Sequence, residues 1–275
     1  MNPDRTPPDA DAKGVVFITG ASSGIGAAFA RELSRRGYDL ILTGRRREQL
    51  EQLAQELTHA HSIRVKVIIA ELADDAALEQ LAERVRSEAQ LEMLINNAGF
   101  GTGGAPFHEQ DYAMHQAMLK VHVQAIVRLT YAALPTLLAR HRGAIVNVSS
   151  VAAFFPIPYH IMYTSTKEFI RAFSEALAIE LRGSGVQVQA LCPGFTRTYF
   201  HARLGIDPDR FYRARGPMKV MSAEEVVQAS LRCLARGDVI CVPGTHNRLV
   251  SYLPYLVPRR LQHWLLGHFG RQMAM

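Results

Sequence analysis

The stretch TGASSGIG, residues 19–26, decides the fold of this chain. It directly follows the apolar run VVFIT (residues 15–19) and leads into AAFARELSRRG (residues 27–37), a segment with helical periodicity. Glycine-rich loops occur in many kinds of turn, so the glycines alone are a weak signal. Between a strand and a helix, however, such a loop is the phosphate-binding turn of a dinucleotide-binding fold, and we favour that interpretation.

Each glycine of this loop has a distinct use in dinucleotide binding. Gly20 permits the tight turn, Gly24 lets the backbone approach a pyrophosphate, and Gly26 lets the helix pack against the strand. The N-terminus of the following helix offers free N–H groups and a positive dipole end to the phosphates. The other residues of this loop that we expect to contact the cofactor are Ser22, Ser23 and Ile25.

Outside the loop, apolar runs alternate with segments of helical period. The predicted strands are residues 15–19, 40–43, 65–70, 93–96, 144–149, 186–192 and 239–242. The predicted helices lie near residues 24–36, 46–60, 74–89, 108–140, 163–182 and 223–236. The strand runs show little polar alternation, as expected for parallel strands buried on both faces. This pattern predicts an α/β fold with a doubly wound parallel sheet of the Rossmann type.

Length and composition predict one domain. The chain has 275 residues, of which 48% are hydrophobic, which is enough for one large core. We predict a disordered tail over residues 1–13, a Rossmann-type domain over residues 14–245 and a basic amphipathic extension over residues 246–275. The tail is polar and rich in Pro and Asp, and it lacks the apolar core of a signal peptide.

Cysteine usage and charge exclude several classes of protein. The three cysteines form no CxxC pair, so we predict neither a disulfide framework nor a metal site, and we expect a cytoplasmic location. The net charge of +6 comes almost wholly from arginine. Before the C-terminus these arginines form no continuous basic stripe with stacking aromatics, so we predict no nucleic-acid partner. No apolar run reaches about eighteen residues, so a membrane-spanning helix is not expected.

The end of the second predicted strand favours NADP(H) over NAD. An NAD site carries an acidic residue there, which binds the ribose 2′-hydroxyl. This chain instead has Arg45, Arg46 and Arg47 after Gly44, and a guanidinium can bind a 2′-phosphate with a fork of N–H donors. The alternative is that these arginines only solvate a helix start, although cations there oppose the helix dipole. We expect Arg45 and Arg46 to contact the cofactor, with Arg45 as the main phosphate ligand.

A tyrosine and a lysine four residues apart are the candidate catalytic pair. In YTSTK, Tyr163 and Lys167 share one helix face. An ammonium about 4 Å from the phenolate would favour ionisation by up to about 4 kcal/mol, which moves the pKa of tyrosine toward neutrality. Such a tyrosine is a general acid or base for a carbonyl or alcohol. Ser150, at the end of a predicted strand, is placed to polarise the substrate oxygen, although serine at a strand end is often only a turn former.

These motifs together resemble the short-chain dehydrogenase/reductase family. The resemblance covers TGASSGIG, NNAG (residues 96–99), a serine thirteen residues before YxxxK, and PG-x-x-x-T (residues 193–198), over roughly residues 13–245. It implies that Ser150, Tyr163 and Lys167 are catalytic, that Lys167 also holds the nicotinamide ribose, and that Tyr163 also contacts the cofactor. The residues that it implies at the cofactor are Asn97, Ala98 and Gly99 on the adenosine side, and Pro193, Gly194, Thr196 and Thr198 beside the nicotinamide.

The chain departs from the family pattern at two positions. His122 stands where the family usually has an asparagine that helps to hold a water relaying protons to the lysine. An imidazole can donate or accept protons near pH 7, so we count His122 among the catalytic residues. The alternative is that His122 only fills space and the relay is weakened. Glu71, followed by Leu72, replaces the family's aspartate after the third strand, and both are expected near the adenine.

An apolar stretch and an aromatic, Arg-rich stretch lie where substrate is expected to bind. Residues 151–162 would flank the cleft beneath Ser150, and residues 195–220 follow the PG turn where such folds carry a lid. They predict a small apolar substrate. Equally, these side chains could pack against a second subunit, since we expect a homodimer or homotetramer.

The C-terminus has an unusual composition. No acidic residue follows Asp238, while arginines alternate with Leu, Tyr, Trp264 and Phe269. This pattern predicts a basic amphipathic helix over residues 247–273, interrupted at Pro254 and Pro258. Such a helix is able to lie on an anionic membrane surface. The alternative, which we favour at this point, is that a partner subunit or the core covers it.

Two classes of function remain open on the sequence. The leading hypothesis is an oxidoreductase that transfers a hydride between NADP(H) and an alcohol or carbonyl, with Tyr163 as general acid or base. Its rival is a nucleotide-binding regulatory or scaffold protein that lost turnover through the change at His122.

Overall fold

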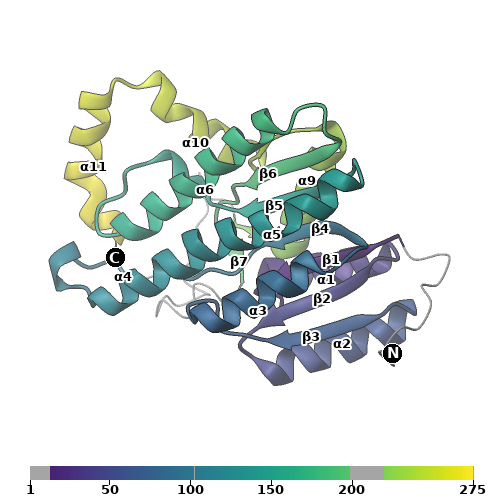
Figure 1. Cartoon of the computed structure of the whole chain (residues 1–275). Coiled ribbons are helices and arrows are strands. Elements are labelled where there is room, and N and C mark those ends of the chain that lie inside the picture. Colours follow the sequence, from purple (N-terminus) through teal and green to yellow (C-terminus); the bar gives the residue numbers. More distant parts are fainter. Residues whose placement is uncertain (1–12, 102, 199–219, 275) are drawn as a thin grey trace.

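A parallel sheet lies between two layers of helices (Figure 1). The computed structural model describes residues 13–101, 103–198 and 220–274. Within these residues the seven-stranded sheet has the order β3-β2-β1-β4-β5-β6-β9. Its strands are β1 (Val15–Thr19), β2 (Asp39–Gly44), β3 (Val65–Ile69), β4 (Leu91–Asn96), β5 (Gly143–Val148), β6 (Val186–Leu191) and β9 (Ile240–Cys241). The predicted fold and all seven predicted strands are confirmed.

The strand order reverses between β1 and β4, and this reversal positions the site. Strands β1 and β4 pair in parallel, so their carboxyl ends lie side by side. The hydroxyl of Thr19, the last residue of β1, accepts hydrogen bonds from the N–H groups of Asn97 (2.9 Å) and Ala98 (3.0 Å), just after β4. Open α/β sheets bind their ligands at such a switch point.

Each face of the sheet has its own apolar core. Alternate residues of a strand point to opposite faces, and β1 shows this directly. Val16 and Ile18 pack in one cluster with Phe29 of α1, whereas Phe17 packs in the other with Leu129 of α5. The first cluster joins the sheet to α1 (Gly24–Arg35), α2 (Arg47–His61) and α9 (Ala223–Arg236). The second joins it to α3 (Asp75–Arg86), α5 (Ala125–Ala139) and α6 (Ile161–Glu180).

Side chains cap the N-termini of two of these helices. The Asp74 carboxylate accepts a hydrogen bond from the N–H of Ala77 at the start of α3. Ser222 and Glu225 form a reciprocal capping box at the start of α9. Ser222 also belongs to a short parallel pair, β7 (Thr196–Arg197) with β8 (Met221–Ser222), that the sequence analysis did not predict. The predicted lid over residues 195–220 lies mostly outside the described residues.

The long helix predicted over residues 108–140 is divided in three. It consists of α4 (Tyr112–Leu119), a π-helical turn η2 (Lys120–Gln124) and α5, and a short 3-10 turn, η1 (Phe107–Glu109), precedes it. The stretch Tyr112–Ala139 is long and apolar enough to cross a membrane by composition, but half of its most apolar window is buried within the protein. We read it as a core helix, because α5 packs against α3 and β4.

The C-terminal segment forms two helices, α10 (Thr245–Leu256) and α11 (Arg259–Ala274). The predicted interruption at Pro258 is confirmed, because Val257 before it is extended and ends α10. The predicted interruption at Pro254 is wrong, since Pro254 lies inside α10. The N–H of Val257 bonds to the carbonyl of Leu253 and closes the last turn over the proline. In addition, the Gln262 side chain donates to the carbonyl oxygens of Pro254 (2.7 Å) and Val257 (2.6 Å).

Candidate active site

Ser150, Tyr163 and Lys167 come together between the end of β5 and the first turns of α6. Ser150 caps the short 3-10 helix η3 (Val151–Phe154), where its hydroxyl accepts the N–H of Ala152 at 3.1 Å. Lys167 is buried, and its ammonium donates to the carbonyl of Val148 at 2.9 Å. The same ammonium lies 5.7 Å from the centre of the Tyr163 ring. The structure therefore assembles a hydroxyl, a phenol and an ammonium at the carboxyl end of the sheet.

Burial controls the ionisation of the phenol and the ammonium. Burial raises the pKa of Tyr163, and the hydrogen bond with Ser150 opposes this only in part. Burial lowers the pKa of Lys167 to about 8. The prediction that Lys167 moves the pKa of Tyr163 toward neutrality is wrong for this structure, because desolvation of the phenolate is the dominant effect. Tyr163 is therefore protonated at pH 7 and placed to donate a proton to a carbonyl oxygen.

His122 lies in the π-helical turn and holds three backbone segments together. Its Nε2 accepts the N–H of Phe100 at 3.0 Å, so the ring proton is on Nδ1, which donates to the hydroxyl of Thr166 at 2.9 Å. That hydroxyl in turn donates to the carbonyl of Tyr163 at 2.9 Å. Because both ring nitrogens are engaged, these contacts give His122 a positioning role, and the expected proton relay through it stays a prediction.

Burial, reinforced by the Lys167 ammonium, lowers the pKa of His122 well below its ordinary value of 6.5. The unfolded chain therefore binds a proton near pH 6.5 that the folded chain does not, so stability falls as the pH drops below that value. We expect wild type to lose about 1 kcal/mol more unfolding free energy than His122→Asn between pH 7.5 and 5.5, from about 1.4 kcal/mol per pH unit. Urea denaturation at both pH values measures this. Exposed His59→Asn is the control, and equal losses in all three proteins would contradict the argument.

The glycine loop has the shape that a bound phosphate requires. A Cβ on Gly26 would lie 2.5 Å from both the Asn97 amide nitrogen and the Gly20 carbonyl oxygen, so a side chain there is excluded. Helix α1 begins without a side-chain cap on its N–H groups and without an acidic residue in its first turn. These free N–H groups and the positive dipole end suit a pyrophosphate, so the residues present fit the predicted dinucleotide.

A groove of about 650 Å³ opens beside this helix start. Gly24 and Thr198 meet in it, because a Cβ on Gly24 would lie 2.9 Å from the Thr198 methyl group. The loop after β1 and the PG-x-x-x-T segment are therefore neighbours, although they are far apart in sequence. Other residues that line the groove are Ser22, Ser23, Ala27, Arg31, Gln49, Gln52, Leu53, Glu56, Arg197, Ala223 and Glu224.

The two candidate arginines have different partners. Arg46 donates to the hydroxyl of Ser22 (2.9 and 3.1 Å) and to that of Ser23 (2.5 Å), so its guanidinium lies over the glycine loop. Arg45 pairs with Glu71 at 3.0 Å instead. The other oxygen of Glu71 accepts the N–H of Ala73 at 3.1 Å. The sequence favoured Arg45 as the main ligand, whereas the structure places Arg46 closer to the loop.

The remaining predicted cofactor residues lie around these groups. Asn97 donates to the carbonyl oxygens of Thr19 (2.9 Å) and Gly20 (3.1 Å) and so fixes the turn, while Gly99 lies beside Lys167. The carbonyl of Pro193 accepts the N–H of Val151 at 3.0 Å, next to Ser150. Of the others, Ala98 packs on the second core cluster, Leu72 is buried in it, Ile25 packs on the first cluster, and Thr196 donates to the carbonyl of Gly194 at 3.0 Å.

Asn247, in the first turn of α10, was missed by the sequence analysis. It is buried and donates to the carbonyl of Pro243 at 2.8 Å. A Cβ on Gly194 would lie 2.5 Å from its side-chain oxygen, so α10 packs directly on the PG turn. Thr166, the partner of His122, was missed too. A lone buried amide or hydroxyl carries no motif, so the sequence offered no signal for either.

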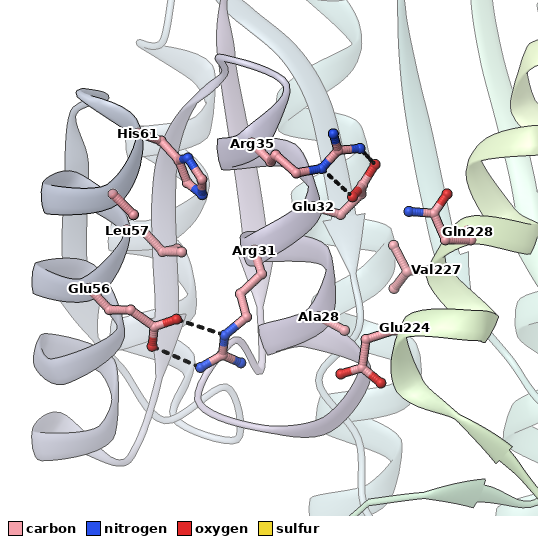
Figure 2. A pocket seen from close by; sticks show the side chains of 11 residues that line it. Ala28, Arg31, Glu32, Arg35, Glu56, Leu57, His61, Glu224, Val227 and Gln228 are labelled. Carbon is pink, nitrogen blue, oxygen red and sulfur yellow. Dashed lines mark hydrogen bonds and ion pairs between the residues drawn. The ribbon is translucent and has the colours of Figure 1, made fainter.

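A second pocket, of about 240 Å³, lies away from this cluster, between α1, α2 and α9 (Figure 2). Arg31 from α1 reaches across it and makes two hydrogen bonds of 2.9 Å with the Glu56 carboxylate of α2. Glu32 pairs with Arg35 in the same way, which lowers the pKa of this carboxyl to about 2. The Arg31–Glu56 pair joins α1 to α2, whereas the Glu32–Arg35 pair lies within α1.

The fold and the Ser150–Tyr163–Lys167 cluster define a Rossmann-type oxidoreductase. Residues 14–208 match the family model described as short chain dehydrogenase. The chain belongs to the short-chain dehydrogenase/reductase family, as the sequence motifs predicted.

The relatives of this chain differ in the substrates that their names state. It is 35% identical over 219 residues to sulfoacetaldehyde reductase 2 of Chromohalobacter salexigens, which covers 78% of this chain and 86% of that protein. It is 30% identical over 259 residues to 17-beta-hydroxysteroid dehydrogenase type 3 of Homo sapiens, with coverage of 92% and 80%. The solved structure of a short-chain dehydrogenase from Sphingobium yanoikuyae in complex with NADPH is 33% identical, with a TM-score of 0.78 and coverage of 95% and 96%.

Proposed function

We propose that this protein transfers a hydride between NADP(H) and an alcohol or carbonyl. The observation that carries the proposal is the cluster of Ser150, Tyr163 and Lys167, next to which the N–H of Val151 bonds to the carbonyl of Pro193 in the PG turn. The bound nicotinamide supplies the hydride. Tyr163 donates the proton to the substrate oxygen in reduction and accepts it in oxidation. Ser150 polarises that oxygen by a hydrogen bond, and Lys167 holds the nicotinamide ribose and stabilises the developing phenolate.

Two arginines support the choice of NADP(H). Arg46 already donates to the loop serines, and Arg45 adds a second guanidinium at the end of β2. This strand end lacks the acidic residue that an NAD site carries there. The relative from Sphingobium yanoikuyae was solved with NADPH. A 2′-phosphate placed here would replace serine hydroxyls as the partner of Arg46 with a charge-assisted bond, which is stronger.

Charge reversal at these arginines tests the cofactor assignment. We expect Arg46→Glu to raise the KM for NADPH at least about 30-fold, since a charge-assisted bond worth about 2 kcal/mol becomes a repulsion. Arg45→Glu, next to Glu71, should raise it about tenfold, whereas the KM for NADH should change little in either variant. Arg47→Glu, whose side chain pairs with Glu51 on α2, is the matched control. An unchanged preference for NADPH in both variants would overturn the assignment.

We propose an apolar carbonyl compound as the substrate. The segment that follows Ser150 carries Val151, Phe154, Phe155 and Ile157, all partly buried beside the site. In addition, one relative named for a steroid aligns with 92% of this chain. Because another relative is named for the small polar sulfoacetaldehyde, the substrate must be measured.

NADPH oxidation measured with a panel of carbonyl compounds tests the proposed reaction. The panel includes bulky apolar ketones, aromatic aldehydes, a steroid ketone and sulfoacetaldehyde. We expect turnover, with the highest kcat/KM among the apolar compounds. If wild type and Tyr163→Phe are equally inactive while NADPH still binds, the regulatory or scaffold function gains support.

We further propose that the protein is a cytoplasmic homodimer or homotetramer. The outer face of α4 and α5 exposes Tyr112, Leu119, Val127 and Tyr131, and Tyr112 is 70% exposed. Burying such a face against a second copy would stabilise an oligomer. A monomer in analytical ultracentrifugation would contradict this.

A further inference from the structure

Helices α10 and α11 expose an apolar surface that the rest of the described chain does not cover. We call their exposed face the C-terminal surface. Leu256 at the end of α10 is 77% exposed and Trp264 of α11 is 62% exposed. Other exposed large apolar side chains of this surface are Leu249, Tyr252, Tyr255 and Leu261. Figure 1 shows α11 standing away from the sheet, next to the α10 end of the molecule.

The charge of this surface has one sign. No Asp or Glu follows Asp238 in the sequence, and Arg248, Arg259 and Arg260 are exposed on the two helices. In the described part of the chain, no carboxylate forms an ion pair with any of the three. Elsewhere, in contrast, arginines such as Arg31 and Arg46 have polar partners. The C-terminal surface therefore carries positive charge with no carboxylate of its own to balance it.

We propose that the C-terminal surface docks on an anionic lipid membrane. Leucine, tyrosine and tryptophan together with arginine are the side chains that lie at the boundary between headgroups and acyl chains. A second copy of this chain is a poorer occupant. A two-fold interface would place the surface against itself, so the three arginines of one copy would meet those of the other without a carboxylate between them.

Docking would place the membrane beside the substrate side of the site. The first turn of α10 is fixed to the PG turn through Asn247 and Gly194, and α10 also packs on η3, which follows Ser150. The surface thus has a fixed position relative to the cleft. An apolar substrate dissolved in the lipid would enter near Tyr163. Docking itself does not depend on the proposed reaction and is measured without turnover.

Trp264 makes the test direct, because it is the only tryptophan in the chain. Full-length protein is mixed with vesicles of phosphatidylglycerol and phosphatidylcholine, or of phosphatidylcholine alone. With the anionic vesicles we expect a blue shift of the tryptophan emission, protection from iodide quenching and co-sedimentation of the protein. Raising the salt concentration should weaken this binding, since exposed charges are screened beyond about 10 Å at 0.1 M salt.

Charge reversal shows whether the arginines cause the binding. We expect the double variant Arg259→Glu and Arg260→Glu to bind anionic vesicles at least about tenfold more weakly, from about 1 kcal/mol for each basic residue at a membrane. The double variant Arg182→Glu and Arg232→Glu changes the net charge equally at exposed positions after α6 and in α9, and it should bind like wild type. Circular dichroism melts of both variants verify folding.

Three results would overturn the proposal. The first is equal binding to neutral and anionic vesicles, and the second is equal loss in the two double variants. The third is a tryptophan emission that is already blue-shifted and protected from iodide without vesicles. That last result would assign the surface to a second copy of the chain.

Discussion

Tyr163→Phe is expected to lower kcat/KM for carbonyl reduction at least about 1,000-fold, within the range that a positioned general acid contributes. Phenylalanine keeps the ring and removes only the hydroxyl that donates to the substrate oxygen. Because burial raises the pKa of Tyr163, the phenol is protonated over the whole neutral range and is ready to donate. The Tyr163 hydroxyl also hydrogen-bonds with Ser150, so in the variant the Ser150 hydroxyl is the only one of the two that can bind the substrate oxygen.

We expect Tyr163→Phe to slow the proton-transfer step and to leave NADPH binding unchanged. Fluorescence titration with NADPH should give a dissociation constant within about threefold of wild type, because the cofactor groove is lined by other residues. Tyr131→Phe, which removes an exposed hydroxyl from α5, is the matched control and should keep full activity. Turnover by Tyr163→Phe within tenfold of wild type would remove Tyr163 from the catalytic role.

Lys167→Met is expected to lower kcat/KM at least about 100-fold and to leave the protein equally or more stable. Turnover falls because the phenolate that forms at Tyr163 loses its nearest cation, 5.7 Å from the ring centre. Stability does not fall, because burial lowers the pKa of Lys167 from 10.5 to about 8, a cost of about 3 kcal/mol to the charged form. Losing the hydrogen bond to Val148 costs about 1–3 kcal/mol and offsets this gain in part.

The same pKa gives wild type a distinct pH dependence. Between about pH 8 and 10.5 the unfolded chain keeps a proton on Lys167 that the folded chain has released, so the contribution of Lys167 to stability rises with pH in this window. Lys167→Met should lack this rise. Urea denaturation at pH 8 and pH 9.5 measures it, with exposed Lys66→Met of β3 as the control. A variant that is clearly less stable than wild type at pH 8 would show that the ammonium supports the fold.

The strands and the main catalytic groups were predictable because their signals are local. VVFIT is buried at all five positions, as its continuous apolar run required, and the spacing of Tyr163 and Lys167 alone places both on one side of α6. Burial, in contrast, depends on what packs around a group. The spacing along a helix predicts how near the phenol and the ammonium lie to each other, but it does not predict how much water the fold excludes from both. The predicted direction of the pKa change at Tyr163 was therefore wrong.

Besides burial, the sequence did not predict the contacts between segments that lie far apart along the chain. Nothing local distinguishes Arg45 from Arg46, and only the fold shows that one faces Glu71 and the other faces the loop serines. The π-helical turn at His122 contains neither proline nor glycine, so periodicity predicted one continuous helix. Pro254 failed as a break signal, because α10 continues through it to Leu256.

The contact between Asn247 and Gly194 divides the C-terminal segment into parts with unequal freedom to change. The first turn of α10 belongs to the catalytic architecture, since any side chain at position 194 or a larger one at position 247 would push the two apart. Among the described residues after Pro258, none makes such a close contact with a glycine of the site. If α11 docks on a membrane as proposed, we expect its replacement to change membrane binding and to leave turnover unchanged. The part of the chain that the active site needs therefore extends into α10. The composition of the sequence, in contrast, predicts that the catalytic domain ends at residue 245.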